Sequence, residues 1–376
     1  MKILILTDYF YPHWTGISKS IYNLVKIKIN ELKFDVLTTK YNNDLDNQDV
    51  ISKTTIYREP FIFSVSRVKY SINIIFKFIL LIRNYDGVLI NSPYSNILVI
   101  SLLTKIFNKK LFIFHQGDLI LPKGFVNVIL EKIFDISSIL SFFISNKIAT
   151  YTRDYAEHSR VIKPFLYKFT PLLMPVIINK KNVNEKNLIY QKLFELKKRK
   201  KIIFGFAGRF VEEKGFDILL NAIPKITKKN SKIHFVFAGD TEITYENFYE
   251  KNQSKISLIK KNLTMLGLLN ETDLQNFYYM IDFIIIPSRS DCFNLVQAEA
   301  MLFGRPSIVS NIHGARYLVN KTGFGVIFEK NSHIDLESKI ISTVKDKINI
   351  RDNYQKVTQV LEPNKIKNNI TEFFLT

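Results

Sequence analysis

The stretch "KIIFGFAGRFVEEKGFDILLNAI", residues 201–223, joins a short apolar run to a glycine-flanked loop and then to a second segment with apolar residues at helical spacing. A short apolar run bounded by turn residues is typical of a strand buried on both faces. The spacing that follows predicts a helix beginning near Phe216. This order of strand, loop and helix is the repeating element of a parallel sheet covered by helices.

The same alternation extends in both directions along the chain. An apolar-periodic helix is predicted from Ser18 to about Leu32, and the tail from about Ile340 is predicted to be helical with a break at Pro363. Alternating strands and helices of this kind predict an α/β fold with parallel sheets. The predicted strands are residues 2–7, 34–39, 87–92, 110–117 and 147–152 in the first half, and 201–210, 232–240, 262–267, 282–288, 305–311 and 325–329 in the second.

A break in this pattern lies near residue 175. Pro171 and Pro175 are followed by a polar segment, residues 180–201, that holds nine Lys/Arg and two Glu. A charge run of this kind is usually a solvated connector and helix face. We therefore expect two doubly wound domains, residues 1–175 and 176–355, with a helical tail, residues 356–376, that packs back on the first domain. Since ligands collect at the carboxyl ends of parallel strands, a cleft between the domains is the expected site.

Composition limits the class of partner and the compartment. The chain holds 53 Lys+Arg and 34 Asp+Glu, a net charge of +19, which favours anionic partners such as nucleotide phosphates, nucleic acid or an acidic membrane surface. One cysteine excludes an internal disulfide framework, and six scattered histidines offer no zinc-ligand spacing. The first apolar run reaches Asp8 too soon for a signal peptide. We expect a cytoplasmic protein.

The motifs from Phe204 to Asn331 resemble the donor half of the retaining GT-B glycosyltransferases of family 4. They are "FGFAGRFVEEKGFDILLNAI", "HFVFAGD", "LTMLG", "IIIPSRSDCFNLVQAEAMLFGRPSIVSN" and "TGFGVIFEKN", in this order. The first half is similar to the family through "ILTDYFYPHWTGISKSIYNLV" and "FIFHQGD". The resemblance implies two Rossmann-like domains, a UDP- or GDP-linked sugar as donor substrate, transfer with retention of anomeric configuration, and neither a metal nor a resident cofactor.

Two basic residues are the expected ligands of the donor diphosphate. Arg209 and Lys214 lie in the loop after the strand at residues 201–210, and Gly208 and Gly215 permit close approach of the backbone. Arg grips two oxygens at once, and Lys places a compact positive charge where the leaving oxygen becomes more anionic. Both positions match the phosphate-binding pair of the family, which gives them catalytic as well as binding roles.

Two acids in "SDCFNLVQAEA" are the expected ligands of the donor's hydroxyls. Asp291 lies ahead of a predicted helix and Glu299 lies one to two turns inside it, and the amides of Phe293, Asn294 and Leu295 lie at the positive end of that helix. The family pattern assigns the ribose to Glu299 and the transferred sugar to Asp291. The family usually has glutamate at both positions. The alternative interpretation makes Asp291 the N-cap of the helix.

Four further positions complete the predicted site or depart from the family. The backbone near Leu266 is expected to lie at the edge of the base. His313 and Tyr317 stand where Gly and Glu are common in the family, so a donor contact from that loop is in doubt. Gly16 and the helix start after it are a candidate phosphate contact.

His115 ends an apolar strand and matches a family histidine near the reacting centre, where Asp118 either orients it or starts a turn. No convincing nucleophile for a double displacement is present in the sequence. The family therefore implies departure of the diphosphate and entry of the acceptor hydroxyl on the same face.

Residues 67–83, "RVKYSINIIFKFILLIR", predict a helix that is apolar on much of its circumference. Ile72, Ile75, Phe76, Ile79 and Ile82 form one stripe, and Ile74, Phe78 and Leu81 form a second. Such a helix is either well buried or inserted in a lipid interface. One hypothesis is a peripheral enzyme on the inner face of the cytoplasmic membrane that glycosylates a lipid-linked or other envelope acceptor.

Three other functions have some support in the sequence. An Asp-any-Asp metal motif of a GT-A enzyme occurs at Asp44 and Asp46, but no apolar strand follows it. Nucleic-acid binding would explain the charge, but the basic runs are not interleaved with aromatic residues. A catalytically weak or inactive nucleotide-sugar-binding relative of the transferases remains open, because Asp291 and Tyr317 depart from the family pattern.

Overall fold

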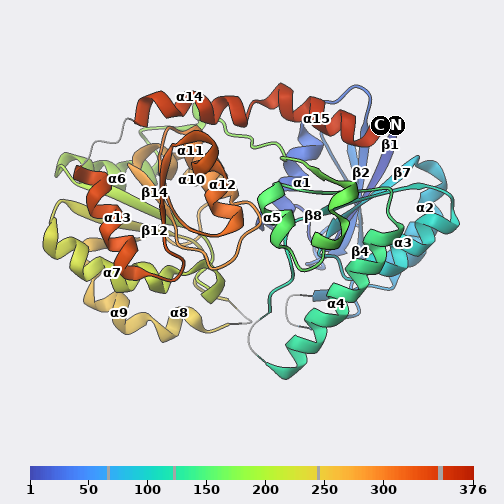
Figure 1. Cartoon of the computed structure of the whole chain (residues 1–376), viewed down its shortest axis with the longest axis horizontal. Coiled ribbons are helices and arrows are strands. Elements are labelled where there is room, and N and C mark those ends of the chain that lie inside the picture. The colour runs from blue at the N-terminus through green and yellow to red at the C-terminus, as the bar shows by residue number, and fades with distance from the viewer. Residues whose placement is uncertain (66–67, 122–123, 244–245, 346–349) are drawn as a thin grey trace. The chain divides into compact units, whose positions relative to one another are not determined.

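The computed structural model describes residues 1–376 with the exception of 66–67, 122–123, 244–245 and 346–349. The chain divides into two compact units (Figure 1). The first unit is Met1–Pro175 together with Glu362–Thr376, and the second unit is Val176–Leu361.

The first unit contains an eight-stranded sheet in the order β10-β9-β8-β7-β1-β2-β4-β3. All its strand pairs are parallel except the pair of β3 with β4. A separate antiparallel pair is formed by β5 (Phe63–Val65) and β6 (Val68–Tyr70). The strands of the large sheet are β1 (Lys2–Thr7), β2 (Lys33–Lys40), β3 (Gln48–Ile51), β4 (Thr54–Pro60), β7 (Gly87–Ser92), β8 (Lys110–His115), β9 (Lys147–Thr150) and β10 (Phe169–Pro171).

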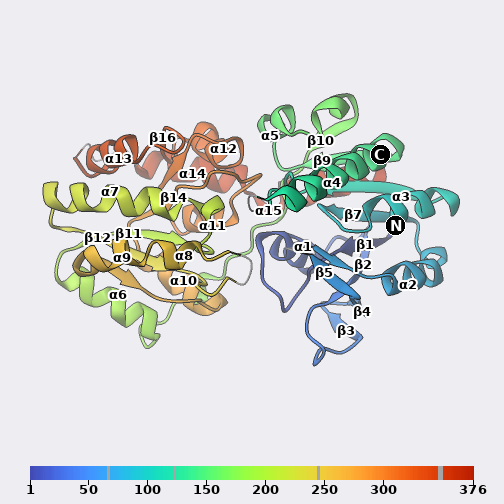
Figure 2. The same cartoon turned by 90° about the horizontal axis from the view of Figure 1, so that it is seen from below.

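Helices cover both faces of this sheet (Figures 1 and 2). Side chains of a strand alternate between faces, so Leu111 and Ile113 join the core under α2 and α3 while Phe112 points to the other face. There the rings of Phe373 and Phe374 on α15 lie 5.5 and 4.9 Å from the ring of Phe112. The helices are α1 (Gly16–Lys26), α2 (Asn73–Leu81), α3 (Ile97–Ile106), α4 (Phe125–Ile144), α5 (Arg153–His158) and α15 (Pro363–Leu375), with 3₁₀ turns at Ile82–Asn84 and Lys163–Lys168.

The second unit contains a six-stranded, all-parallel sheet in the order β13-β12-β11-β14-β15-β16. Its strands are β11 (Ile202–Ala207), β12 (Ile233–Ala238), β13 (Leu263–Met265), β14 (Phe283–Ile286), β15 (Ser307–Ser310) and β16 (Gly325–Phe328). Its helices are α6 (Leu188–Lys198), α7 (Phe216–Lys229), α8 (Phe248–Lys251), α9 (Gln253–Leu258), α10 (Glu271–Met280), α11 (Leu295–Leu302), α12 (His313–Thr322), α13 (His333–Lys345) and α14 (Ile350–Val360).

Alternating residues of these strands again build two cores. Phe204 and Phe235 face α7 and α13, whereas Ile203 and Val236 face α6, α10 and α12. Burial on both faces explains why the strands are continuous apolar runs in the sequence. It also leaves the carboxyl ends of the strands as the edge at which polar loops gather.

The predicted end of the second domain at residue 355 is wrong, because the second unit ends at Leu361. That residue lies inside α14, which packs on α11 and α12, and the Tyr354 hydroxyl donates to the Leu302 carbonyl at 2.8 Å. The second unit therefore extends to Leu361, and the segment that belongs to the first unit is α15 with Glu362 before it and Thr376 after it. Pro363 occupies the first turn of α15, where its missing N–H costs no hydrogen bond.

The predicted helix at residues 67–83 is wrong in extent. Arg67 lies outside the described residues, β6 occupies Val68–Tyr70, and the helix is the shorter α2. Of the two predicted stripes, Ile74 and Phe78 are buried together with Ile82, whereas Phe76 is 62% exposed. The helix is therefore half-buried and places one apolar face outward.

Candidate functional site

The predicted phosphate-binding loop of the second unit follows β11. Half-buried Arg209 comes two residues after the strand, and Lys214 ends a 3₁₀ turn at Glu212–Lys214. Gly215 then begins α7 with φ of 66°, a left-handed conformation that favours glycine. A Cβ at Gly215 would lie 2.1 Å from the Pro287 carbonyl oxygen, so the loop after β14 passes directly against this turn.

Arg289 links these two loops, a role that could not be assigned from the sequence. Its two terminal guanidinium nitrogens each donate to one carboxylate oxygen of Asp217 at 2.8 Å, and one of them also donates to the Glu212 carbonyl at 2.6 Å. A bidentate pair of this geometry fixes orientation as well as distance. Arg289 therefore holds the turn that carries Lys214 beside the loop that carries Asp291.

The structure brings Lys214 and Asp291 into direct contact. The Lys214 Nζ donates to Asp291 Oδ1 at 2.7 Å, and both side chains are largely buried, with 19% and 12% exposed. Burial alone would lower the pKa of Lys214, but the carboxylates of Asp291 and Glu213 outweigh burial and raise the pKa. Lys214 is therefore a firmly charged cation whose partner is an acid of the predicted sugar site.

Asp291 is not the N-cap of α11, so that alternative is wrong. The cap is Asn294, whose side-chain oxygen accepts from the Gln297 amide at 2.9 Å. The Asn294 side-chain nitrogen in turn donates to Asp291 Oδ2 at 2.9 Å. Asp291 thus joins Lys214 to the capping residue, with one carboxylate oxygen on each.

The loop that departs from the family pattern begins α12. A Cβ at Gly314 would lie 2.0 Å from the Asp291 carbonyl oxygen, so only glycine fits against the loop after β14. The Nδ1 of His313 lies 2.8 Å from a guanidinium nitrogen of Arg316, and Tyr317 is half-buried in the same helix. Gly314 therefore shapes the site through its backbone, and His313 contacts its own helix.

Glu299 lies on α11 and is buried, with 3% exposed. The Tyr278 hydroxyl on α10 donates to Glu299 Oε2 at 2.9 Å. The backbone near the predicted base-edge residue Leu266 is held by its amide, which donates to the Phe237 carbonyl at 2.8 Å, before a turn at Gly267. Phe293 and Leu295 are buried on either side of the cap residue Asn294.

In the first unit, His115 is buried at the end of β8 with both ring nitrogens engaged. Nδ1 lies 3.0 Å from the Ser92 hydroxyl, and Nε2 lies 3.0 Å from Asp118 Oδ1. Burial would raise the pKa of Asp118, but hydrogen bonds from His115, Ser159 and the Arg160 amide lower it to about 2. Of the two roles predicted for Asp118, orientation of His115 is the one that the geometry supports.

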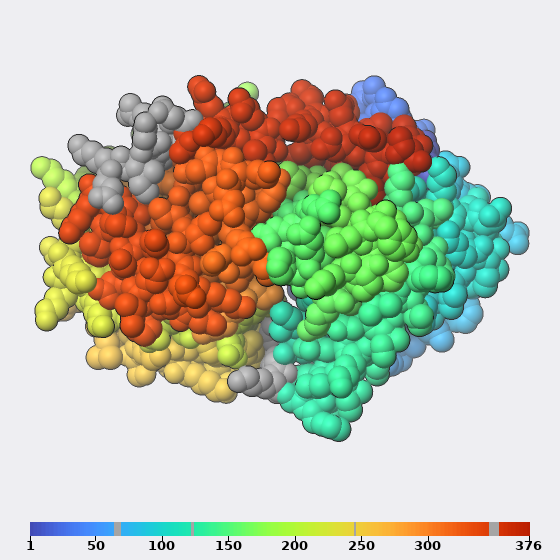
Figure 3. Space-filling model, viewed as in Figure 1, coloured from blue at the N-terminus to red at the C-terminus, as the bar shows by residue number. Residues whose placement is uncertain are grey.

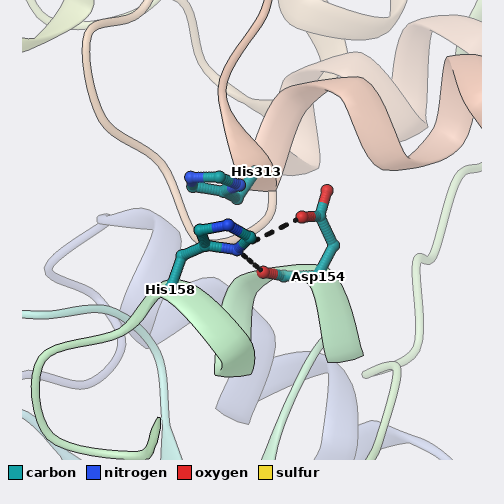
Figure 4. A group of neighbouring side chains, drawn as sticks. All are labelled: Asp154, His158 and His313. Atoms are coloured by element: carbon teal, nitrogen blue, oxygen red, sulfur yellow. Dashed lines mark hydrogen bonds and ion pairs between the residues drawn. The ribbon is translucent and has the colours of Figure 1, made fainter.

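Another histidine of the first unit lies on α5. The Nδ1 of His158 is 2.8 Å from the Asp154 carbonyl oxygen and 3.6 Å from its carboxylate, as the dashed lines in Figure 4 mark. Both contacts span one helical turn and stabilise a six-residue helix. His313, also labelled in Figure 4, belongs to the second unit.

Gly16 begins α1 and is exposed. The Thr15 hydroxyl accepts from the Ser18 amide at 3.1 Å, and the Ser18 hydroxyl accepts from the Thr15 amide at 2.7 Å. This capping box satisfies two donors at the helix start. Apart from Gly16, its chain neighbours and the backbone of its own helix, no described heavy atom lies within 4 Å of a Cβ built on Gly16, so a ligand can approach the remaining amides there.

Asp8 is a buried acid at the end of β1 that the sequence analysis did not assign to the site. Its carboxylate accepts from the Ser95 amide at 3.0 Å and from the Ser95 hydroxyl at 2.7 Å. Burial raises the pKa of Asp8 from 3.8 to about 7, although the Ser95 hydrogen bonds and Lys69 act in the opposite direction. The sequence does not reveal the contact of Asp8 with Ser95, because Asp8 is one acid at the end of an apolar run and Ser95 is 87 residues away.

The pKa of Asp8 predicts a loss of stability as the pH rises. Between about pH 4 and 7 the folded protein binds a proton at Asp8 that the unfolded chain has released, so the free energy of unfolding falls by up to about 4 kcal/mol across this range. Urea unfolding at pH 5 and pH 7.5 measures the part of this fall that lies above pH 5, about 3 kcal/mol. The Asp8→Asn variant should show a smaller difference, and an equal one would contradict the assignment to Asp8.

One family model matches part of the chain. Residues 191–359 match the family model described as glycosyl transferases group 1. The matched residues all lie within the second unit, Val176–Leu361. Over the whole chain, the sequence is 26% identical across 363 residues to an uncharacterized glycosyltransferase of Methanocaldococcus jannaschii, covering 92% of this chain and 88% of the relative.

A shorter part of the chain is similar to a galactosyltransferase whose name includes a lipid-diphosphate acceptor. The chain is 30% identical over 185 residues to the UDP-Gal:alpha-D-GlcNAc-diphosphoundecaprenol alpha-1,3-galactosyltransferase of Escherichia coli, covering 49% of this chain and 44% of the relative.

Two solved structures share their fold with this chain over nearly its whole length. The Anabaena protein HepE in complex with UDP and glucose matches with a TM-score of 0.74 at 16% identity, covering 99% of this chain and 98% of HepE. Sucrose-phosphate synthase from Thermosynechococcus elongatus matches with a TM-score of 0.77 at 14% identity, with the same coverage of 99% and 98%. The two-domain α/β fold with parallel sheets is therefore GT-B.

Proposed function

We propose that the protein is a retaining glycosyltransferase that moves a sugar from a UDP- or GDP-linked donor to a hydroxyl of a lipid-linked or cell-envelope glycan. The observation that carries the proposal is the group of Lys214, Asp291 and Asn294 at the carboxyl ends of β11 and β14, where ligands of open parallel sheets bind. The match of residues 191–359 to the group 1 family supports it. We propose this reaction without a bound metal or a resident cofactor.

Each residue of the second unit has a distinct part in this proposal. Arg209 and Lys214 hold the diphosphate and stabilise its charge as the bond to the sugar breaks. Glu299 accepts from the ribose hydroxyls and Asp291 from a hydroxyl of the transferred sugar. Since Asp291 already neutralises Lys214 at 2.7 Å, diphosphate binding must draw Lys214 partly away from it, which releases a carboxylate oxygen for the sugar.

The acceptor side is assigned to the first unit. His115 ends β8 there, but its contacts with Ser92 and Asp118 engage both ring nitrogens. We therefore propose that His115 positions the acceptor or donor sugar only after one of these contacts is exchanged. The acceptor class rests on the resemblance to transferases of envelope glycans, one of which has a lipid diphosphate in its name.

Thermal-shift measurements with UDP, GDP, ADP and their sugars test donor binding. We expect the wild-type protein to be stabilised by one nucleotide, and by about 2.7 kcal/mol at a ligand concentration one hundred times Kd. Arg209→Ala and Glu299→Gln should reduce the shift, whereas Lys225→Ala, an exposed lysine on α7, should not. A wild-type protein that no nucleotide shifts would defeat the proposal; variants that respond like the wild type would defeat only the residue assignment.

A weak or inactive nucleotide-sugar-binding protein is the second candidate. The ion pair of Lys214 and Asp291 favours it, because an acid that neutralises the phosphate-binding lysine weakens that lysine as a ligand. Hydrolysis of the sugar nucleotide, followed as release of UDP or GDP, separates the two. Nucleotide binding without turnover in the presence of envelope glycans would favour the second candidate.

A further inference from the structure

An apolar stripe along α4 of the first unit faces solvent. Phe125, Ile129, Ile133, Ile136, Leu140 and Phe143 follow one another at intervals of three or four residues, and all are exposed, with Phe125 at 82%, Ile136 at 59% and Phe143 at 70%. At 1.5 Å per residue the stripe is about 27 Å long. Figure 3 shows α4, in teal, at the surface of the first unit.

The buried side of α4 is the more polar one. Of its 20 residues, Phe134, Ser138, Ser141 and Phe142 are buried, so two serines face inward while six large apolar residues face outward. A helix at a water-exposed surface has the opposite arrangement. Burial against the unit's own core therefore does not explain the apolar stripe.

Exposed apolar residues also lie on α3, which packs beside α4 (Figure 2). Leu102 and Ile106 of α3 are 48% and 74% exposed. Contiguous apolar surface on this scale marks an interaction site rather than scattered surface residues. We call the exposed side chains of these two helices the α3–α4 face.

The charges around the α3–α4 face are arranged for an anionic partner. Glu131 and Asp135, the acids of α4, are paired with Arg160 at 3.9 and 3.0 Å, while Lys132 is exposed. At the carboxyl end of α4, the Lys168 Nζ donates to the Phe143 and Ser145 carbonyls at 2.8 and 3.1 Å. The acids are thus neutralised and basic groups flank the apolar stripe.

Tyr167 extends this end of the face. Its ring is 76% exposed, and the Lys168 ammonium lies 6.0 Å from the ring centre. An amphipathic aromatic ring beside a lysine, at the end of an apolar stripe, is typical of the boundary between lipid chains and headgroups. The first unit as a whole has a net charge of +9, since it contains 24 Lys/Arg and 15 Asp/Glu.

We infer that the α3–α4 face inserts into the interface of an anionic lipid bilayer. Among the described residues no helix is both long and apolar enough to cross a membrane, so the mode is peripheral, with α4 lying along the surface. A second copy of the chain is the less favourable occupant, because two units of charge +9 repel each other while anionic headgroups attract them. This inference specifies the partner of the first unit and is independent of donor binding by the second.

The test uses flotation of the full chain with vesicles of phosphatidylglycerol and phosphatidylcholine, and with vesicles of phosphatidylcholine alone. The test variant is Ile133→Gln/Ile136→Gln/Leu140→Gln, and the matched control is Leu188→Gln/Leu258→Gln/Ile334→Gln, three exposed apolar residues of the second unit. We expect wild type and control to float with the anionic vesicles and less so at high salt, and the test variant to lose at least about tenfold in partitioning.

Each outcome decides between explanations. Equal flotation of the test variant, or no flotation of the wild type, would overturn the inference. A wild-type protein that does not float but is a dimer, and that the three substitutions convert to a monomer, would identify a second copy as the occupant. Thermal shifts by nucleotides, measured on the same three proteins, should be equal. A wild type that floats but binds no nucleotide would keep this inference and remove the proposed function.

Discussion

Replacing Lys214 with methionine is expected to lower the rate of sugar transfer by about 10²- to 10³-fold, the usual cost of removing one group that stabilises charge in a transition state. Methionine keeps the length and the apolar stem of the side chain while removing the ammonium. The effect should fall on kcat more than on KM, because the charge on the diphosphate grows as the bond to the sugar breaks. Steady-state kinetics with the nucleotide-sugar identified by thermal shift measure both constants.

The same substitution also affects stability, and a double variant separates the two effects. Removing Lys214 leaves the largely buried carboxylate of Asp291 without its ion-pair partner, which costs about 3 kcal/mol or more when the pair is buried. In Lys214→Met/Asp291→Asn the uncompensated charge is gone, so most of the stability should return. Transfer should stay low. If the double variant regained activity together with stability, Lys214 would have only a structural role.

Most strands of the two large sheets could be predicted from the sequence, the exceptions being β3, β4 and β10, and the reason is physical. Strands such as β1, β7 and β11 are buried on both faces, so they are short continuous apolar runs, and their predicted bounds agree with the structure within a few residues. The strand β3 lies at the sheet edge with β4 next to it, and β5 and β6 form a separate small pair. All four are mixed in polarity, so residues 48–70 gave no strand signal.

The candidate site was predictable only as a set of residues, not as a set of contacts. Loop position and the family resemblance selected Lys214 and Asp291, but their direct pairing across 77 residues follows from the sheet order that places β11 beside β14. Asn294 caps α11, whereas one interpretation of the sequence made Asp291 the cap. The difference depends on which of two nearby side-chain oxygens reaches the Gln297 amide. Arg289 could not be distinguished from other basic residues, because its partner Asp217 is 72 residues away, in the first turn of α7.

The loops that carry the site approach one another so closely that glycine is required between them. At Gly215 two costs coincide: φ is 66°, and an added Cβ would lie 2.1 Å from the Pro287 carbonyl oxygen and 2.9 Å from its carbonyl carbon. A real Cβ cannot occupy that position, so the backbone of one loop would have to move. Because Lys214 precedes Gly215 and the loop of Asp291 follows Pro287, the movement would separate the two members of the ion pair.

Gly215→Ala is therefore expected to destabilise the protein by about 3 kcal/mol or more, the sum of about 1 kcal/mol for the left-handed backbone and the remainder for the steric conflict. The matched control is Gly267→Ala, where φ is 72° and no described heavy atom beyond the chain neighbours lies within 4 Å of the added Cβ. Urea unfolding of the two variants isolates the conflict with Pro287, because the control carries the conformational cost alone. Equal losses of stability in the two variants would show that the contact with Pro287 relaxes freely, and the loops would then not be held in one geometry by this glycine.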